Sequence, residues 1–162
     1  MVERTVDLCI VGSAGAGLTA AVKAKERGAR DVLVLEKQGS TGGCTKLPCG
    51  LFAVDSPVQK RFGFNYSADD FFKRLMMVTN WNCDAMLCRK WLKGSGETIR
   101  WLEEMGMEFD AVRPANGIEG KAASTYHYTR KNAYHTGAQI VKTLMARCEE
   151  LGVEFALNTR AR

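Results

Sequence analysis

Two short apolar runs near the start of the chain flank a helical pattern. The first run, Val6 to Val11 (VDLCIV), ends at a glycine, and the second is Asp31 to Glu36 (DVLVLE). Short apolar runs bounded by turn residues are typical of buried strands in a parallel sheet. From about Gly15 to Arg27, apolar residues recur on one helical face before Gly28 stops the helix: Leu18, Ala21 and Val22. This order predicts a βαβ unit with a right-handed crossover.

The middle of the chain shows one loop-like stretch followed by helical patterns. Residues 39–58 are rich in glycine and proline and are predicted to form a loop. The motif Ser67-x-x-Asp70 resembles a capping box and predicts a helix that continues to about Val78. Two further helices are predicted, one from about Asp84 to Lys93 and one from Ser95 to Gly106.

The last part of the chain returns to the alternation of helix and strand. Residues 110–135 show no clear period and are predicted to be an extended, functional loop. Thr136 to Leu151 has the clearest helical stripe, which ends at a glycine: Ile140, Val141, Leu144, Met145, Cys148 and Leu151. Gly152 to Thr159 is predicted to be a third strand. The fold class is therefore α/β, a partial Rossmann-like doubly wound parallel sheet with a helical insertion.

Composition and charge exclude several classes of function. The 162 residues amount to one domain or part of one, and 46% are hydrophobic and 25% charged, as in globular proteins. The net charge is +5, and the lysine and arginine residues are scattered along the sequence, so no basic stripe for nucleic acid is present. No apolar stretch reaches the roughly 20 residues of a membrane span. The first strand begins about five residues from Met1, which leaves no room for a cleavable signal and favours the cytoplasm.

Six cysteines raise the question of a metal site. Two pairs share the spacing C-x4-C, Cys44 with Cys49 and Cys83 with Cys88. This is not the C-x2-C spacing of zinc ribbons, and the second pair is predicted to be helical, with its thiols on different faces. We expect no metal, and we expect reduced, mostly buried thiols.

The turn after the first strand carries the candidate chemistry. Gly12, Ala14 and Gly17 occupy the three glycine positions of the dinucleotide pattern G-x-G-x-x-G. The first glycine permits a tight turn, the second lets a pyrophosphate approach the backbone, and the third lets helix and strand pack closely. Glu36 follows about 20 residues later, at the end of the second strand, where an acid binds ribose hydroxyls. A carboxylate there disfavours NADP, and the choice between NAD and FAD stays open at this point.

The stretch Leu35 to Gly50 (LEKQGSTGGCTKLPCG) resembles the second signature of the fumarate reductase/succinate dehydrogenase flavoprotein family. The turn Val11 to Gly17 is similar to the first signature of that family, except at Ala14. The segments Trp101 to Phe109 and Thr136 onward also resemble the family, in the same order. The resemblance implies an FAD enzyme that moves a hydride between flavin N5 and an activated C–C bond of a small enoate-like or steroid-like substrate.

The resemblance also implies a cofactor role for each matched residue. Pyrophosphate contacts are implied for Gly12, Ser13, Ala14, Gly15, Ala16 and Gly17. Adenosine contacts are implied for Glu36 and Lys37. Contacts with the flavin ring and ribityl chain are implied for Gly43, Cys44, Thr45, Cys49 and Gly50. Cys44 replaces the usual asparagine and Leu51 a common glycine, so both positions depart from the family pattern.

Members of the family are several hundred residues longer and carry a capping domain and most catalytic groups in that remainder. We therefore expect residues 1–162 to be the N-terminal portion of an FAD-binding domain. Its expected parts are residues 1–60 with the βαβ unit and flavin loop, 66–135 with the helical insertion and loop, and 136–162 with the last helix and strand. The expected partner is the remainder of a split or truncated flavoprotein. Two alternatives are an NAD-binding Rossmann module and a non-catalytic fragment that pairs with another chain.

No catalytic residue is assigned from the sequence. His127 and His135 are candidates, although the favoured interpretation of each is a surface or loop-packing histidine. The nearby Tyr126, Tyr128 and Tyr134 are interpreted equally well as loop anchors.

Overall fold

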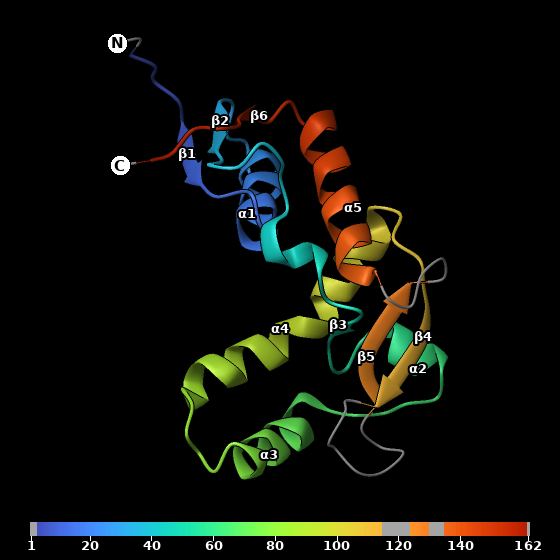
Figure 1. The fold of residues 1–162 in the computed structure, drawn as a ribbon. Helices are drawn as coiled ribbons and strands as arrows, with labels where there is room; N and C mark the ends of the chain where they lie inside the picture. The colour runs from blue at the N-terminus through green and yellow to red at the C-terminus, as the bar shows by residue number, and fades with distance from the viewer. Residues whose placement is uncertain (1–2, 115–123, 130–134, 162) are drawn as a thin grey trace. The chain divides into compact units, whose positions relative to one another are not determined.

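The computed structural model describes residues 3–114, 124–129 and 135–161, which form an α/β fold. The predicted βαβ unit is present as β1 (Leu8–Val11), α1 (Gly15–Glu26) and β2 (Val32–Leu35), shown in Figure 1. β1 runs parallel to β2. The predicted third strand is β6 (Glu154–Ala156), which lies parallel to the other edge of β2. The resulting order β1-β2-β6 is that of one half of a doubly wound sheet.

The apolar stripes predicted for the flanking helices form the core around this sheet. On α1, Leu18, Ala21 and Val22 are fully buried, as the sequence predicts. On α5 (Thr136–Glu150), the buried members of the stripe are Val141, Leu144 and Cys148. The Cys148 thiol lies 3.9 Å from the Leu18 carbonyl oxygen, so α1 and α5 are in contact.

The first strand is less buried than the sequence predicts. Leu8 is 38% exposed and Val11 is 70% exposed. The reason is that β1 is an edge strand of this sheet, whereas β2 lies between two neighbours and buries Val32 and Val34.

A second sheet occupies the region in which the sequence predicts mainly loops. Within residues 110–135, β4 (Phe109–Pro114) and β5 (Ser124–Thr129) form an antiparallel pair, so the prediction of an extended loop was wrong there. Within residues 39–58, the short strand β3 (Leu51–Phe52) pairs with β5, and α2 (Pro57–Arg61) follows it. The order of this sheet is β3-β5-β4.

The helical insertion contains two long helices, not the three that the sequence predicts. α3 (Ala68–Val78) begins after the Ser67 cap as predicted, but α4 (Ala85–Glu104) continues through Gly94 and Ser95 without a break. Ser95 Oγ accepts a hydrogen bond of 3.0 Å from the Val54 N–H, and a Cβ on Gly96 would lie 2.6 Å from the Asp55 carbonyl oxygen. The small residues serve close packing against another segment instead of ending the helix.

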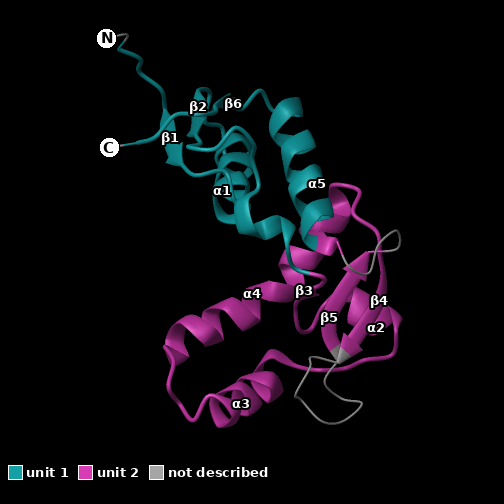
Figure 2. Ribbon diagram, in the orientation of Figure 1, with its two compact units in different colours: residues 1–48, 137–162 teal, residues 49–136 magenta. Residues whose placement is uncertain are grey.

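The chain is divided into two compact units, which have different colours in Figure 2. The first comprises residues 1–48 and 137–162, with the parallel sheet, α1 and α5. The second comprises residues 49–136, with the antiparallel sheet and α2, α3 and α4, and its core includes Val54, Phe71 and Leu92. Among the described residues, no helix combines the length and the apolar character needed to cross a membrane.

Candidate functional site

The turn after β1 requires glycine at two positions. Gly12 has a φ of +96°, a conformation that side chains disfavour, and its N–H donates to the Leu35 carbonyl oxygen at 2.8 Å. At Gly17, a Cβ atom would lie 1.9 Å from the Gly12 carbonyl oxygen. Only glycine therefore lets the first turn of α1 pack this closely against the loop. These are the geometric roles that the pattern predicts for its first and third glycines.

Ala14, at the second position of the pattern, fits the backbone without strain. Its φ of −73° and ψ of −179° are accessible to any L-residue. Ala14 is the N-cap of α1 and makes no side-chain capping bond. Its backbone forms a parallel bridge with Gly42, and a Cβ on Gly43 would lie 3.5 Å from the Ala14 methyl group. The methyl group therefore faces the glycine-rich loop.

Thr45 joins that glycine-rich loop to the start of α1. Its Oγ1 accepts a hydrogen bond of 2.8 Å from the Gly15 N–H, across 30 residues of sequence. The Gly42 N–H also donates to the Ser13 carbonyl oxygen at 2.9 Å. The loop then forms a short 3-10 helix, η1 (Gly43–Lys46). These two hydrogen bonds hold the glycine-rich loop against the turn that precedes α1.

The N-terminus of α1 is suited to an anion. The first helical hydrogen bond runs from the Leu18 N–H to the Ala14 carbonyl oxygen, so the Ala16 and Gly17 amides precede it and have no helical acceptor. The first turn contains no acidic side chain that would compete with an anion. These amides and the positive end of the helix dipole favour a phosphate group.

Glu36 is held by the turn that precedes α1. Its side chain is buried at the end of β2, where Oε2 accepts hydrogen bonds from the Ser13 N–H at 2.9 Å and the Ser13 hydroxyl at 2.6 Å. Oε1 accepts a bond of 2.8 Å from the Gln38 N–H. These bonds, the Ser13 hydroxyl first, lower the pKa of Glu36 to about 2. Glu36 is therefore ionised at neutral pH, and the Ser13 side chain is directed to it.

The remaining predicted residues are distributed over both units. Lys37 and Cys44 are exposed in the first unit. Cys49 and Gly50 begin the second unit, where a Cβ on Gly50 would lie 3.0 Å from a ring atom of Tyr126 and 3.1 Å from one of Tyr128. The two tyrosine rings therefore leave space only for glycine at position 50. Tyr134, the third candidate anchor, lies outside the described residues.

The comparison with protein families decides what this site belongs to. A family model described as "FAD binding domain" matches residues 7–162. The chain belongs to this family. FAD is therefore the dinucleotide of the domain, and the NAD-binding alternative does not hold.

Several reductases are similar to this FAD-binding domain. It is 34% identical over 155 residues to a vinyl phenol reductase from Lactiplantibacillus plantarum, covering 96% of this chain and 30% of that protein. It is 32% identical over 152 residues to an acrylate reductase flavoprotein subunit from Shewanella woodyi, covering 93% of this chain and 29% of that protein. The open conformation of a flavocytochrome c3 fumarate reductase matches with a TM-score of 0.87 and 25% identity, covering 96% of this chain and 27% of that one. The chain thus spans less than a third of the length of these relatives.

The residues of the first unit fit the dinucleotide that the family binds. The tight glycine turn, the amides at the start of α1 and an ionised acid at the end of β2 are the three features that a bound dinucleotide needs. All three lie in one unit and are connected through Thr45 and Ser13.

The two histidines of the domain have different environments. His127 is completely buried, and its Nδ1 lies 3.0 Å from the Thr125 carbonyl oxygen and 3.2 Å from that of Leu51. Nδ1 therefore carries the proton, and Nε2 accepts from the Ser56 hydroxyl at 2.6 Å. Burial foremost lowers the pKa of His127. His127 is a neutral core histidine on β5 and not the surface or loop-packing histidine that the sequence favours, while His135 is exposed ahead of α5.

The cysteines differ from the sequence prediction in placement. Cys9, Cys44 and Cys49 are exposed, and Cys148 is the buried thiol, whose pKa burial raises to about 11. Cys83 lies before α4 and not within it, so the prediction that Cys83 and Cys88 face different sides of a helix was wrong. Over the described ranges, no group of three or more metal-ligating side chains is present.

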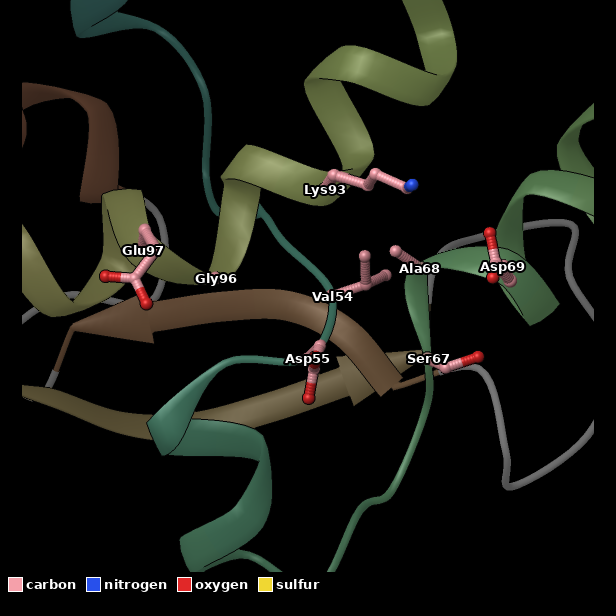
Figure 3. A pocket seen from close by; sticks show the side chains of 8 residues that line it. All are labelled: Val54, Asp55, Ser67, Ala68, Asp69, Lys93, Gly96 and Glu97. Atoms are coloured by element: carbon pink, nitrogen blue, oxygen red, sulfur yellow. The ribbon is translucent and has the colours of Figure 1, made fainter.

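A polar cleft of about 290 Å³ lies in the second unit, between α3, α4 and the segment after β3 (Figure 3). Its acidic residues have basic partners: Asp55 pairs with Lys60, Asp69 with Arg89 and Glu97 with Arg100. The cleft contains none of the predicted cofactor residues; it is lined by Val54, Asp55, Ser67, Ala68, Asp69, Lys93, Gly96 and Glu97.

Gly137 is a residue that the sequence did not single out. A Cβ there would lie 2.1 Å from the Thr45 carbonyl oxygen, and the Gly137 N–H donates to the Pro48 carbonyl oxygen at 2.9 Å. Gly137 thus lets the start of α5 pack directly on the glycine-rich loop. The available signal was a glycine in the first turn of a strongly amphipathic helix, where a better helix former is normally expected.

Proposed function

We propose that this FAD-binding domain is the cofactor-holding part of a flavoprotein that transfers a hydride between flavin N5 and a conjugated carbon–carbon double bond. The observation that carries the proposal is the connection of the glycine turn, the glycine-rich loop and Glu36 within one unit. The names of the relatives, which include vinyl phenol, acrylate and fumarate reductases, support a small conjugated substrate.

The residues of this chain bind and orient the cofactor. Bound FAD supplies the chemistry, because its isoalloxazine ring accepts and donates hydride. The Ala16 and Gly17 amides at the start of α1 would bind the pyrophosphate, and Glu36 with Lys37 would bind the adenosine. The flavin ring and ribityl chain would lie along Gly43, Cys44, Thr45, Cys49 and Gly50. Of these, Gly43, Cys44 and Cys49 are exposed, which permits approach of a flat ring.

An FAD titration tests the proposal. Purified protein should bind FAD, with a change in flavin absorbance and fluorescence, and should bind NAD more weakly. Gly12→Val should abolish binding, because Gly12 has a φ of +96°. Gly94→Ala is the matched control, because a Cβ at Gly94 meets nothing within 4 Å, and it should bind FAD as the wild type does. Binding of NAD in preference to FAD would contradict the proposal.

We place the catalytic groups in the remainder of a longer flavoprotein, which is the partner of this domain. The support is that the chain covers 30% of the vinyl phenol reductase to which it is similar. A chimaera in which this chain replaces the matching segment of that reductase should bind FAD and reduce vinyl phenols, whereas this chain with FAD alone should not. Turnover by the isolated chain would contradict this division of labour.

The compartment that we propose is the cytoplasm. Cys9, Cys44 and Cys49 are exposed thiols, and exposed thiols persist where the glutathione pool keeps them reduced. Fractionation of the native host tests this, and recovery in a periplasmic or secreted fraction would contradict it.

A further inference from the structure

Two cysteines occupy a defined pair of positions at the start of α4. Asp84 is the N-cap, and its carboxylate accepts a hydrogen bond of 2.9 Å from the Leu87 N–H. Cys83 therefore holds the position before the cap, and Cys88 holds the fourth position of the helix. Side chains at these two positions pack against each other at capped helix ends, where apolar pairs form the hydrophobic staple.

The contacts of the thiols agree with this geometry. Cys83 Sγ lies 3.4 Å from Thr79 Oγ1 and 3.9 Å from Met76 Sδ, so α3 packs against the thiol. Interaction with the Cys83 thiol is one of the causes that raise the pKa of Cys88. Both cysteines are half-buried, which leaves room for a small reagent to reach them.

The turn that precedes the pair fixes where Cys83 lies. Asn80 and Trp81 have φ angles of +49° and +58°, which reverse the chain tightly after α3. The Trp81 N–H donates to the Met76 carbonyl oxygen at 2.9 Å, which closes this turn. The fold therefore brings the Cys83 thiol to the helix end that carries Cys88.

We propose that Cys83 and Cys88 are a redox-active pair that closes to an intramolecular disulfide on reaction with a low-molecular-weight disulfide such as oxidised glutathione. The first protein thiolate attacks oxidised glutathione, forms a mixed disulfide and releases one glutathione thiolate. The second protein thiolate attacks the protein sulfur of that mixed disulfide and releases the second glutathione. Two protein thiols lose two electrons and two protons, and one oxidised glutathione becomes two reduced ones.

The environment of the two thiols sets the order of attack. Burial foremost, then the interaction with Cys83 and the nearby Asp84 carboxylate, raises the pKa of Cys88. A thiol with a raised pKa is a poor first nucleophile, because only the thiolate attacks. Cys83 is therefore the attacking residue and Cys88 closes the disulfide, faster at higher pH.

Peptide mapping tests the proposal on the folded chain. Native protein is treated with oxidised glutathione, quenched in acid, alkylated with a maleimide and digested with trypsin, which releases residues 75–89 with both cysteines in one peptide. That peptide should lose two hydrogens and take up neither maleimide nor glutathione. Cys88→Ser should instead retain glutathione on Cys83, because no second thiol remains to displace it.

The same treatment in urea separates the effect of the fold from that of sequence proximity. Closure should be at least about tenfold more favourable in the folded protein, because the fold raises the effective concentration of one thiol at the other. Equal closure in folded and unfolded protein would overturn the proposal. So would a wild-type peptide that carries two glutathiones, or one that remains fully reduced and takes up two maleimides.

Discussion

The tightest packing in the candidate FAD site lies at a single residue, Gly17. A Cβ there would lie 1.9 Å from a backbone oxygen, which cannot move aside as a flexible side chain can. We predict that Gly17→Ala lowers the free energy of unfolding by about 1–3 kcal/mol and weakens FAD binding. Urea denaturation and an FAD titration measure the two effects.

Gly94→Ala provides the comparison for that substitution. Gly94 lies inside α4 with open space at its Cβ position, so alanine should stabilise the protein by about 0.5–1 kcal/mol. If the two substitutions changed stability equally, close packing at Gly17 would not be the cause.

Ala14 is the position at which the opposite change should help. Because Ala14 is the N-cap of α1, Ala14→Gly removes a methyl group at the helix end that is proposed to bind the pyrophosphate. Glycine is also the better N-cap, by about 0.5 kcal/mol. We predict tighter FAD binding in a fluorescence titration, and unchanged or weaker binding would refute this.

Glu36 should make stability depend on acid pH. Its pKa is about 2 in the folded protein and 4.5 as an unperturbed group, so the unfolded chain takes up the proton first. The contribution of ionised Glu36 to the free energy of unfolding is fully present above about pH 4.5 and is lost as the pH falls toward 2. Denaturation midpoints from pH 6 to 2 should fall more steeply for the wild type than for Glu36→Gln.

Ser13→Ala is the second variant for this measurement. Removal of the hydroxyl removes the largest cause of the low Glu36 pKa. The pH range over which the protein loses stability should therefore narrow. Identical pH profiles in wild type and Glu36→Gln would show that this carboxylate does not hold the turn.

At the scale of elements, His127 fastens β5 to its neighbours. The ring connects β5 with Leu51 of β3 and with Ser56, the N-cap of α2, whose hydroxyl also accepts from the Gln59 N–H at 3.0 Å. Because burial lowers the pKa of His127 below 6.5, the unfolded chain binds the proton first. The contribution of neutral His127 to the free energy of unfolding is therefore fully present above about pH 6.5, and it declines as the pH falls below that value.

Substitution of each histidine tests this coupling. His127→Gln should remove the decline in unfolding free energy between neutral and mildly acid pH, whereas His135→Gln, at an exposed position, should keep it. Ser56→Ala should cost about 1–3 kcal/mol, because it leaves the buried Nε2 without a donor. If the unfolding free energy of the wild type did not decline between neutral and mildly acid pH, His127 would not be neutral and buried in the folded protein.

Elements with a strong local pattern could be predicted, and elements defined by distant contacts could not. The apolar runs and the glycine turn were sufficient for β1, α1, β2 and α5. The β4–β5 pair was missed because its strands stabilise each other across the sheet and lack a clean alternation of apolar and polar residues. α4 was divided in error, because Gly94 to Gly96 has the composition of a break and serves close packing.

The site shows the same division between local and distant information. The glycine turn and Glu36 could be predicted, because each has a local pattern. The bonds from Gly15 to Thr45 and from Ser13 to Glu36 could not, since they join residues 30 and 23 positions apart. The relation of Cys83 to Cys88 was missed because Cys83 was taken as helical, whereas it precedes the Asp84 cap of α4.

At the scale of the whole molecule, the second unit is an insertion into the first. The two residues that flank the insertion, Pro48 and Gly137, both belong to the first unit. The Gly137 N–H donates to the Pro48 carbonyl oxygen at 2.9 Å. We predict that residues 1–48 joined to 137–162 by a short Gly/Ser linker fold alone. Circular dichroism should show the α/β fold, and ADP should bind through the glycine turn.

A variant of this shortened chain is the control. Glu36→Gln should weaken ADP binding, because it replaces the acid expected at the ribose. A shortened chain without cooperative unfolding would show that the first unit depends on the inserted residues.

The position of β2 in the centre of the parallel sheet has a kinetic consequence. One neighbour, β1, is close in the sequence and can pair as soon as both strands have left the ribosome. The other neighbour, β6, is synthesised only after the whole of the second unit. Until then, one edge of β2 is an open template for the wrong strand. The slow step of folding should therefore be the arrival of β6, and co-translational yield should depend on how quickly the inserted unit folds.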